Sequence, residues 1–221
     1  MTALTLIRDT ARARWRMILA WGLVLPLVYQ VAMLIALVVR FGDLPNYIVF
    51  YDWPGNVWRI IEGTPAWSDI PPIVANEWLI EIGYMNYDFG LGISEWALAV
   101  VPWALAVLFV MGCLTGLCLA LRSAGTCAPT VARSSGAATT LGAGLVLMTN
   151  ATMSWVVCCA TPSWVVGLAM LGLGVSTSLA LESLGGWLSG AGFGLLLATT
   201  YAMAWLRSRP AAAGAAHPAT A

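Results

Sequence analysis

The sequence predicts an all-α, polytopic transmembrane protein of four to five helical spans, with a broken or re-entrant segment after Pro162. Of its 221 residues, 60% are hydrophobic and only 9% are charged, whereas an ordinary soluble domain is about 25% charged. The mean hydropathy is +0.84. Several apolar stretches are also long enough to cross a bilayer, which takes about 20 residues. This composition excludes a soluble enzyme, a disordered regulator and a secreted disulfide scaffold.

The first span is expected over residues 17–39, after a basic cytoplasmic N-terminus formed by residues 1–16. The span has no charged residue and four arginines precede it, so the positive-inside rule places the N-terminus in the cytoplasm. A signal peptide is not expected, because its apolar core is only about 7–15 residues long and ends at a small-residue cleavage site. Here Arg40 follows the apolar run. Pro26 is expected to kink the helix.

Residues 40–94 are expected to form an acidic, aromatic loop on the periplasmic side. Seven carboxylates stand against two arginines there, together with eight Trp and Tyr residues. Trp and Tyr prefer the headgroup level of a bilayer, so short interfacial helices are expected, one of them over residues 72–82. An interface anchor or a protein-docking surface is favoured over cation binding. The residues predicted to dock a partner are Trp53, Trp58, Trp78, Glu77 and Glu81.

The rest of the chain divides into four segments. A second transmembrane helix is expected over residues 95–121 and a cytoplasmic loop over residues 122–136. A C-terminal helical unit with a Cys-Cys motif follows over residues 137–206, and residues 207–221 form an Ala- and Pro-rich tail that is expected to be disordered.

The number of spans depends on the segment after Pro162. Five full spans would place Arg207 and Arg209 outside the cell, against the positive-inside rule. Four spans with a broken segment would place both arginines inside. Irregular backbone is tolerated at membrane depth where protein covers it, and Gly172 and Gly174 favour such a break. The four-span topology is therefore preferred, and five spans stay open.

The adjacent pair Cys158-Cys159 is the least expected feature of the chain, which has five cysteines. Adjacent Cα atoms lie about 3.8 Å apart, whereas a disulfide prefers about 5.5–6 Å, so a disulfide within the pair is disfavoured. Two thiolates can instead bind a soft ion such as Cu(I) or, by the same logic, Hg(II). The pair comes about 20 residues, or about 30 Å, into the third span, and is expected near the outer face. Packing is the equally open alternative for these two small side chains.

The last third of the chain carries a short pattern, which runs through Cys158-Cys159-Ala-Thr-Pro162, Leu171-Gly172, Glu182, Arg207 and Arg209. In these residues the chain resembles the mercuric-ion transport membrane proteins of the MerT type. That family has a Cys-Cys-x-x-Pro element in its first span and a final helix that ends in arginines. The resemblance implies that Cys158 and Cys159 accept a metal from the periplasmic side. The family's cytoplasmic cysteine pair has no adjacent counterpart here, where only Cys127 is available.

Small and polar residues mark particular helix faces. Glycines four residues apart let helix backbones approach closely, and Gly112 with Gly116 forms such a stripe on the second span. Packing within the chain is favoured for these stripes, and docking onto another subunit is the alternative. The residues predicted to contact other helices or to line a path to the cysteines are Asn150, Thr152, Pro162, Gly186, Gly190 and Gly194.

Two functions from different classes follow. In the first, a bacterial inner-membrane protein handles or transports a soft metal cation through the vicinal cysteines, with a periplasmic metal carrier as candidate partner. In the second, the chain is a non-catalytic accessory subunit of a larger membrane complex, and its acidic loop docks a periplasmic protein. Metal handling ranks first because it alone uses the cysteine pair. No enzyme activity, no cofactor beyond a soft metal ion and no nucleic-acid partner are expected, since the chain lacks a basic stripe and its one histidine, His217, lies in the tail.

Overall fold

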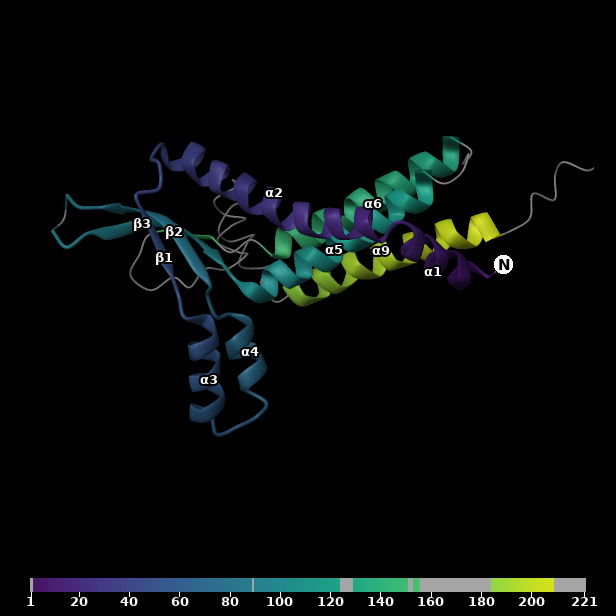
Figure 1. The fold of residues 1–221 in the computed structure, drawn as a ribbon. Helices are drawn as coiled ribbons and strands as arrows, with labels where there is room; N and C mark the ends of the chain where they lie inside the picture. Colours follow the sequence, from purple (N-terminus) through teal and green to yellow (C-terminus); the bar gives the residue numbers. More distant parts are fainter. Residues whose placement is uncertain (1, 89, 124–128, 151–152, 156–183, 209–221) are drawn as a thin grey trace, which may run out of the picture.

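The computed structural model describes residues 2–88, 90–123, 129–150, 153–155 and 184–208. Long helices form a bundle, and a small antiparallel sheet with two short helices lies at one end of it (Figure 1). The chain is therefore mostly helical, as predicted, but it is not all-α. The sheet is the correction: its first strands fall in the segment expected to be a loop and at the expected start of the second span, and its last strand, Met153–Trp155, falls within the expected C-terminal helical unit.

Four long helices make up the bundle: α2 (Trp15–Phe41), α5 (Pro102–Ser123), α6 (Pro129–Thr149) and α9 (Gly185–Ser208). Side-chain bonds join the far ends of these helices, because the Arg207 guanidinium donates to the Leu121 carbonyl and Arg14 donates to the Ser123 hydroxyl. Helices α5 and α9 thus end where α2 begins. At mid-bundle, the Tyr29 hydroxyl donates to the Leu147 carbonyl at 2.8 Å, which ties α2 to the last turns of α6.

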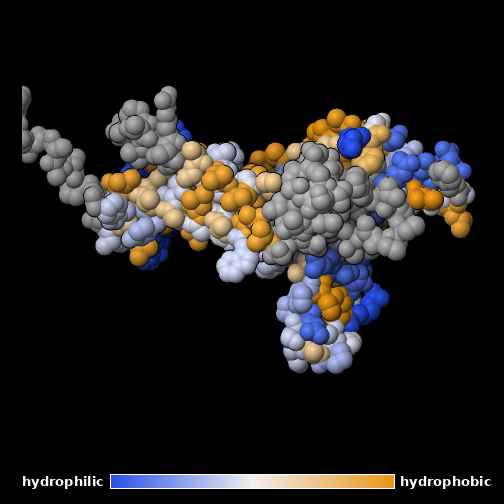
Figure 2. Space-filling view, turned by 180° about the vertical axis from the view of Figure 1, so that it is seen from behind, coloured by the Kyte–Doolittle hydropathy of each residue, from blue (hydrophilic) through white to orange (hydrophobic). Residues whose placement is uncertain are grey.

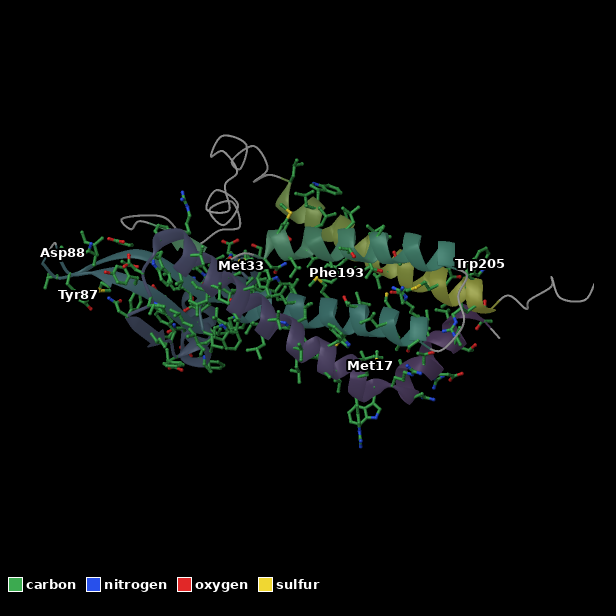
Figure 3. The ribbon with its side chains drawn as sticks, turned by 90° about the horizontal axis from the view of Figure 1, so that it is seen from above. Met17, Met33, Tyr87, Asp88, Phe193 and Trp205 are labelled. Atoms are coloured by element: carbon green, nitrogen blue, oxygen red, sulfur yellow. The ribbon has the colours of Figure 1, made fainter. Side chains whose placement is uncertain are left out.

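Basic residues gather where α5 and α9 end. The short helix α1 (Ala3–Ala13) packs there through Ala3, Leu6 and Ile7 against α5 and α9. We call this the arginine end. It is formed by Arg8, Arg12, Arg14, Arg16, Arg122 and Arg207. Seen from above, Trp205 lies near this end, and Tyr87 and Asp88 lie at the opposite extreme (Figure 3).

Within the described residues, α2 and α5 are long and apolar enough to cross a membrane. Helix α2 covers the whole expected first span and continues through Pro26. Helix α5 begins at Pro102, later than the expected start at residue 95, because the preceding apolar residues pair as a strand. Proline suits the first turn of a helix, where the missing N–H has no helical partner in any case.

Glycines bring α2 and α5 into backbone contact. A Cβ added to Gly112 would lie 2.5 Å from the Trp21 carbonyl oxygen and 2.9 Å from the Gly22 Cα atom. One turn on, a Cβ on Gly116 would lie 3.0 Å from the Trp21 Cβ atom. The predicted Gly112–Gly116 stripe is therefore a packing surface within the chain. A second close approach joins α6 to α9 through Gly142 and Gly192.

The sheet has the order β1-β2-β3-β4, and all pairs are antiparallel. Its strands are β1 (Tyr47–Phe50), β2 (Ile80–Asn86), β3 (Ile93–Val100) and the three-residue β4 (Met153–Trp155). One face packs on α2, where Trp96 and Leu98 are buried beside Leu37, and the Trp96 ring stacks on Phe41 at 6.4 Å. This contact fixes the sheet to the end of the bundle.

Two short helices project from the sheet as an arm, α3 (Trp53–Gly63) and α4 (Ile70–Ala75) (Figure 1). The helix expected over residues 72–82 is only partly present. Helix α4 ends at Ala75, and β2 begins at Ile80. The reason is the alternation Ile80-Glu-Ile-Gly-Tyr84, whose period of two suits a strand better than a helix.

Candidate functional site

Negative charge is concentrated at the sheet end of the molecule. We call residues 43–100, which hold β1, α3, α4, β2 and β3, the acidic module. It contains eight carboxylates and one arginine, Arg59, so its net charge is −8 + 1 = −7. In the space-filling view, hydrophilic residues gather on the arm and the sheet, whereas hydrophobic residues spread along the long helices (Figure 2). The charges thus lie at the two ends of an apolar bundle.

Glu81 is the centre of a hydrogen-bonded cluster on one face of the sheet. It lies opposite Val49 in the β1–β2 register, so Tyr47 and Tyr51 are its diagonal neighbours on the same face. The Tyr47 hydroxyl donates to Glu81 Oε1 at 2.8 Å, and the Tyr51 hydroxyl donates to Oε2. Because the single phenolic proton of Tyr47 goes to Glu81, the Ser94 hydroxyl, 3.0 Å away, is the donor to Tyr47.

Burial and nearby carboxylates disfavour ionisation of three tyrosines in this module. Burial raises the pKa of Tyr47 to about 12, and the hydrogen bond to Glu81 acts in the same direction. Burial also raises the pKa of Tyr51, and the hydrogen bond to Glu81 is the second cause. For Tyr84, the negative charge of Asp43 is the main cause of a raised pKa. The phenols of Tyr47 and Tyr51 are therefore neutral when they donate to Glu81.

A second polar network joins α3 to the segment between α4 and β2. The Asn56 amide on α3 donates to Glu77 Oε1 at 2.6 Å, and Arg59 Nη2 donates to Asn56 Oδ1 at 2.7 Å. Asp52 caps α3, because its Oδ1 accepts from the Gly55 N–H at 3.2 Å. Glu77 and Glu81, two predicted docking residues, are thus partly engaged in bonds that hold the module together.

The tryptophans of the module divide into packed and exposed side chains. Trp53 and Trp78 are half-buried, and the Trp78 ring lies edge-on to Tyr51 at 5.9 Å. Trp58 is 62% exposed, and Trp67, in the turn between α3 and α4, is 80% exposed. Of the three tryptophans predicted to dock a partner, Trp58 is the one available on the surface. Trp67 is a further exposed ring that the prediction did not include. Its position beside acidic residues was the sequence feature that could have indicated it.

The edge strand β1 adds three exposed apolar side chains that sequence reasoning missed, and Ile48 and Phe50 are the most exposed of them. Ile48 is 57% exposed and Phe50 is 74% exposed. Both lie in the run Tyr-Ile-Val-Phe between Pro45 and Pro54. Such a run of β-branched and aromatic residues is typical of a strand, and it was the available signal.

The predicted metal ligands Cys158 and Cys159 lie outside the described residues, as do Thr152 and Pro162. The last described residue before the pair is Trp155, which pairs with Trp96 of β3. Asn150 is described, and its amide donates to the Val146 carbonyl of its own helix at 2.7 Å.

The glycine stripe of α9 has open space beside it. A Cβ added to Gly186, Gly190 or Gly194 would meet no described heavy atom within 4 Å. The glycines that pack against a neighbouring helix in this half of the chain are Gly142 and Gly192 instead. The predicted stripe therefore remains a candidate contact surface for another chain.

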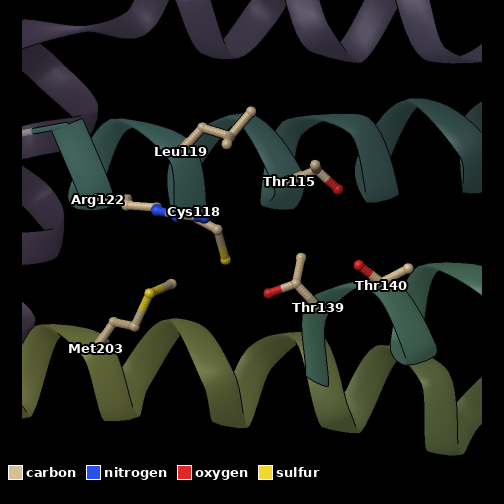
Figure 4. Close-up of a pocket in the computed structure, with 7 residues that line it drawn as sticks. All are labelled: Thr115, Cys118, Leu119, Arg122, Thr139, Thr140 and Met203. Carbon is tan, nitrogen blue, oxygen red and sulfur yellow. The ribbon is translucent and has the colours of Figure 1, made fainter. Parts of the chain in front are cut away.

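A cavity of about 210 Å³ lies between α5, α6 and α9 near the arginine end. The side chains of Cys118 and Met203 point into it from opposite helices (Figure 4). Cys118 Sγ also lies 3.1 Å from Thr200 Oγ1. Across the described ranges, no group of three or more His, Cys, Asp or Glu residues could hold a metal ion. The cavity is lined by Thr115, Cys118, Leu119, Arg122, Thr139, Thr140 and Met203.

Comparison with known proteins places the chain in no family: no family model, no curated protein and no solved structure matches it.

Proposed function

We propose that this chain is a multi-pass inner-membrane protein that acts as a non-catalytic accessory subunit and docks a basic partner protein on its acidic module. The membrane location is supported first by α2. Ten large apolar side chains of this helix are exposed, for example Leu23 at 66% and Val39 at 77%. Water would disfavour so long an apolar surface on a monomer, whereas lipid suits it.

The charges support the orientation. The arginine end carries six arginines at one end of the bundle, and the module carries a net charge of −7 at the other. By the positive-inside rule, the arginine end lies in the cytoplasm and the module lies outside. Arg207 contacts the end of α5 and so lies at the arginine end, which this orientation places in the cytoplasm. The four-span topology likewise places Arg207 inside the cell.

The segregation of charge is the observation that carries the docking function. Negative charge in the module would steer a basic partner toward it. Trp58 and Trp67 add exposed rings, and tryptophan is enriched among the residues that contribute most to protein interfaces.

Site-specific photocrosslinking in cells tests this function. The exchange Trp58→p-benzoylphenylalanine places the reactive group on the module, and Leu197→p-benzoylphenylalanine places it on the exposed apolar face of α9. We expect a discrete protein adduct at position 58 and none at position 197. The adduct should decrease in Glu62→Gln/Asp69→Asn, since both carboxylates are exposed on the arm. Equal adducts at the two positions, or none at either, would contradict docking by the module.

Soft-metal handling is the second candidate, and the position of β4 favours it. Trp155 is paired in the sheet, so the chain that leads to Cys158 starts at the module end, which the proposed orientation places outside. A metal carrier in the periplasm could reach that end. Titration of the purified protein with Cu(I) and Hg(II) under reducing conditions tests this candidate, with Cys158→Ser/Cys159→Ser as control. Tight binding that is lost in the double variant would support it, and equal or negligible binding by both would exclude it.

A further inference from the structure

The outer edge of β1 presents backbone groups that no described residue pairs with. On its inner side, the Tyr51 N–H donates to the Leu79 carbonyl at 3.0 Å, in continuation of the β1–β2 register. Backbone groups of successive residues point to opposite sides of a strand. Val49 therefore shares the inward direction of Tyr51, whereas Ile48 and Phe50 direct their N–H and C=O groups outward.

The side chains of the same two residues continue a hydrophobic face that runs off the sheet. The register aligns Ile48 with Ile82 and Leu98 in one cross-strand row, and Phe50 with Ile80 and Val100 in the next. Exposure rises along each row. Leu98 is 2% exposed, Ile82 is half-buried and Ile48 is 57% exposed. The face is thus covered at β3 and open at β1.

Natural sheets usually protect such an edge with lysines, prolines, charges or bulges, since an open apolar strand pairs readily with another chain. The four residues of β1, Tyr-Ile-Val-Phe, include none of these. Charge lies at both ends of the strand instead, at Asp43 before it and Asp52 after it. An edge that is apolar in its middle and acidic at its ends selects a strand of matching chemistry.

We infer that β1 receives an extended, apolar segment of the partner protein by β-strand addition, with basic residues on either side of that segment facing Asp43 and Asp52. This inference rests on the proposed docking function and specifies how the partner binds. Outward N–H and C=O groups of Ile48 and Phe50 would pair with the added backbone, and the added side chains would cover the two exposed apolar rows.

Two other occupants fit the edge less well. Hydrocarbon cannot satisfy the outward backbone groups, and open sheet edges do not occur in contact with lipid tails. A second copy of this chain could pair β1 with β1, but it would bring together two modules that each carry a net charge of −7. A basic-flanked strand satisfies the hydrogen bonds, covers the apolar rows and matches the charge.

Binding of a model peptide to the full chain in detergent tests the inference. The probe is a fluorescent peptide of alternating Val and Thr with two arginines at each end. The control peptide is identical but N-methylated at its three central residues, so it keeps the charge and loses backbone donors. We expect the control to bind at least tenfold more weakly. Equal binding of both peptides would show attraction by charge alone, which would overturn strand addition and leave docking in place.

Variants of β1 locate the binding edge. Phe50→Pro removes an outward N–H that the β1–β2 pairing does not use, and edge strands tolerate proline. It should weaken peptide binding at least tenfold without lowering the unfolding temperature. Ile48→Lys, which keeps the backbone, should also weaken binding, whereas Val49→Thr on the other face should change it less than twofold. Unchanged binding in both edge variants would overturn the inference.

Two further results separate this inference from the proposed function. A crosslinked adduct at position 58 together with no peptide binding would overturn strand addition and leave docking in place. A dimer of the purified chain that Phe50→Pro dissociates would place a second copy on the edge and would also overturn the inference.

Discussion

The helical bundle and the acidic module are stabilised by different contacts. In the bundle, the absence of side chains at Gly22 and Gly112 lets α2 and α5 touch through their backbones. In the module, a single carboxylate, Glu81, accepts hydrogen bonds from two tyrosines across the sheet. The bundle should therefore be sensitive to added volume and insensitive to charge, and the module should behave in the opposite way.

Added volume between α2 and α5 should have the largest effect. In Gly112→Leu, the first side-chain atom would lie 2.5 Å from the Trp21 carbonyl oxygen, which is backbone and cannot rotate away. We expect a loss of about 3 kcal/mol in the free energy of unfolding, typical of severe overpacking. Denaturant unfolding in detergent micelles measures it.

Gly194→Leu is the matched control for this substitution. Its added side chain enters space that is open among the described residues, so the free energy of unfolding should change little. Equal destabilisation by the two substitutions would contradict the contrast between the two glycine stripes.

Removal of the central carboxylate should be next in size. Glu81→Ala takes the acceptor from both Tyr47 and Tyr51. Hydrogen bonds to charged groups contribute about 1.5–3 kcal/mol, and we expect a loss of about 2 kcal/mol confined to the module. Hydrogen exchange should quicken at β1 and β2 amides and stay unchanged in α5. Glu62→Ala, at an exposed site on α3, should leave all of these rates unchanged.

The bundle and the module also differ in how well the sequence predicts their structure. Long apolar runs predict helices well, since α2 covers its whole predicted span and α5 covers most of its own. The apolar stretch over residues 96–100 predicts the start of a helix, but it belongs to strand β3, because periodicity cannot distinguish a buried strand from a buried helix. Pairing with β2 makes these residues a strand, and that pairing depends on residues elsewhere in the chain.

The candidate site was predictable in composition and not in geometry. Acidic and aromatic residues in 40–94 predicted a docking surface, and Trp58 is exposed there. The bonds from Tyr47 to Glu81, 34 residues apart, follow from strand register, which composition does not contain. For that reason composition predicts Glu81 as a docking residue, although its carboxylate is bonded to Tyr47 and Tyr51.

Alkaline pH should loosen the module, with a smaller effect than loss of Glu81. Because the pKa of Tyr47 is raised to about 12 in the fold, against 10.0 in the unfolded chain, its stabilising contribution is complete below pH 10 and is lost as pH rises toward 12. Module stability should therefore fall across this window, followed by tyrosinate absorbance and Trp fluorescence. Tyr47→Phe should flatten the pH dependence, and an identical slope in both proteins would contradict the assignment.

The smallest effect on stability should come from the exposed tryptophans, and here the two regions offer a matched pair. Trp67 in the module and Trp187 at the start of α9 are both 80% exposed. Replacing either by Ala should change the free energy of unfolding by less than about 0.5 kcal/mol, as at other surface sites. Only Trp67→Ala should lower the yield of the adduct formed through position 58, by about tenfold if this ring is an interface anchor. An equal loss in Trp187→Ala would extend the partner's footprint onto the bundle, and the acidic module would then no longer account for docking by itself.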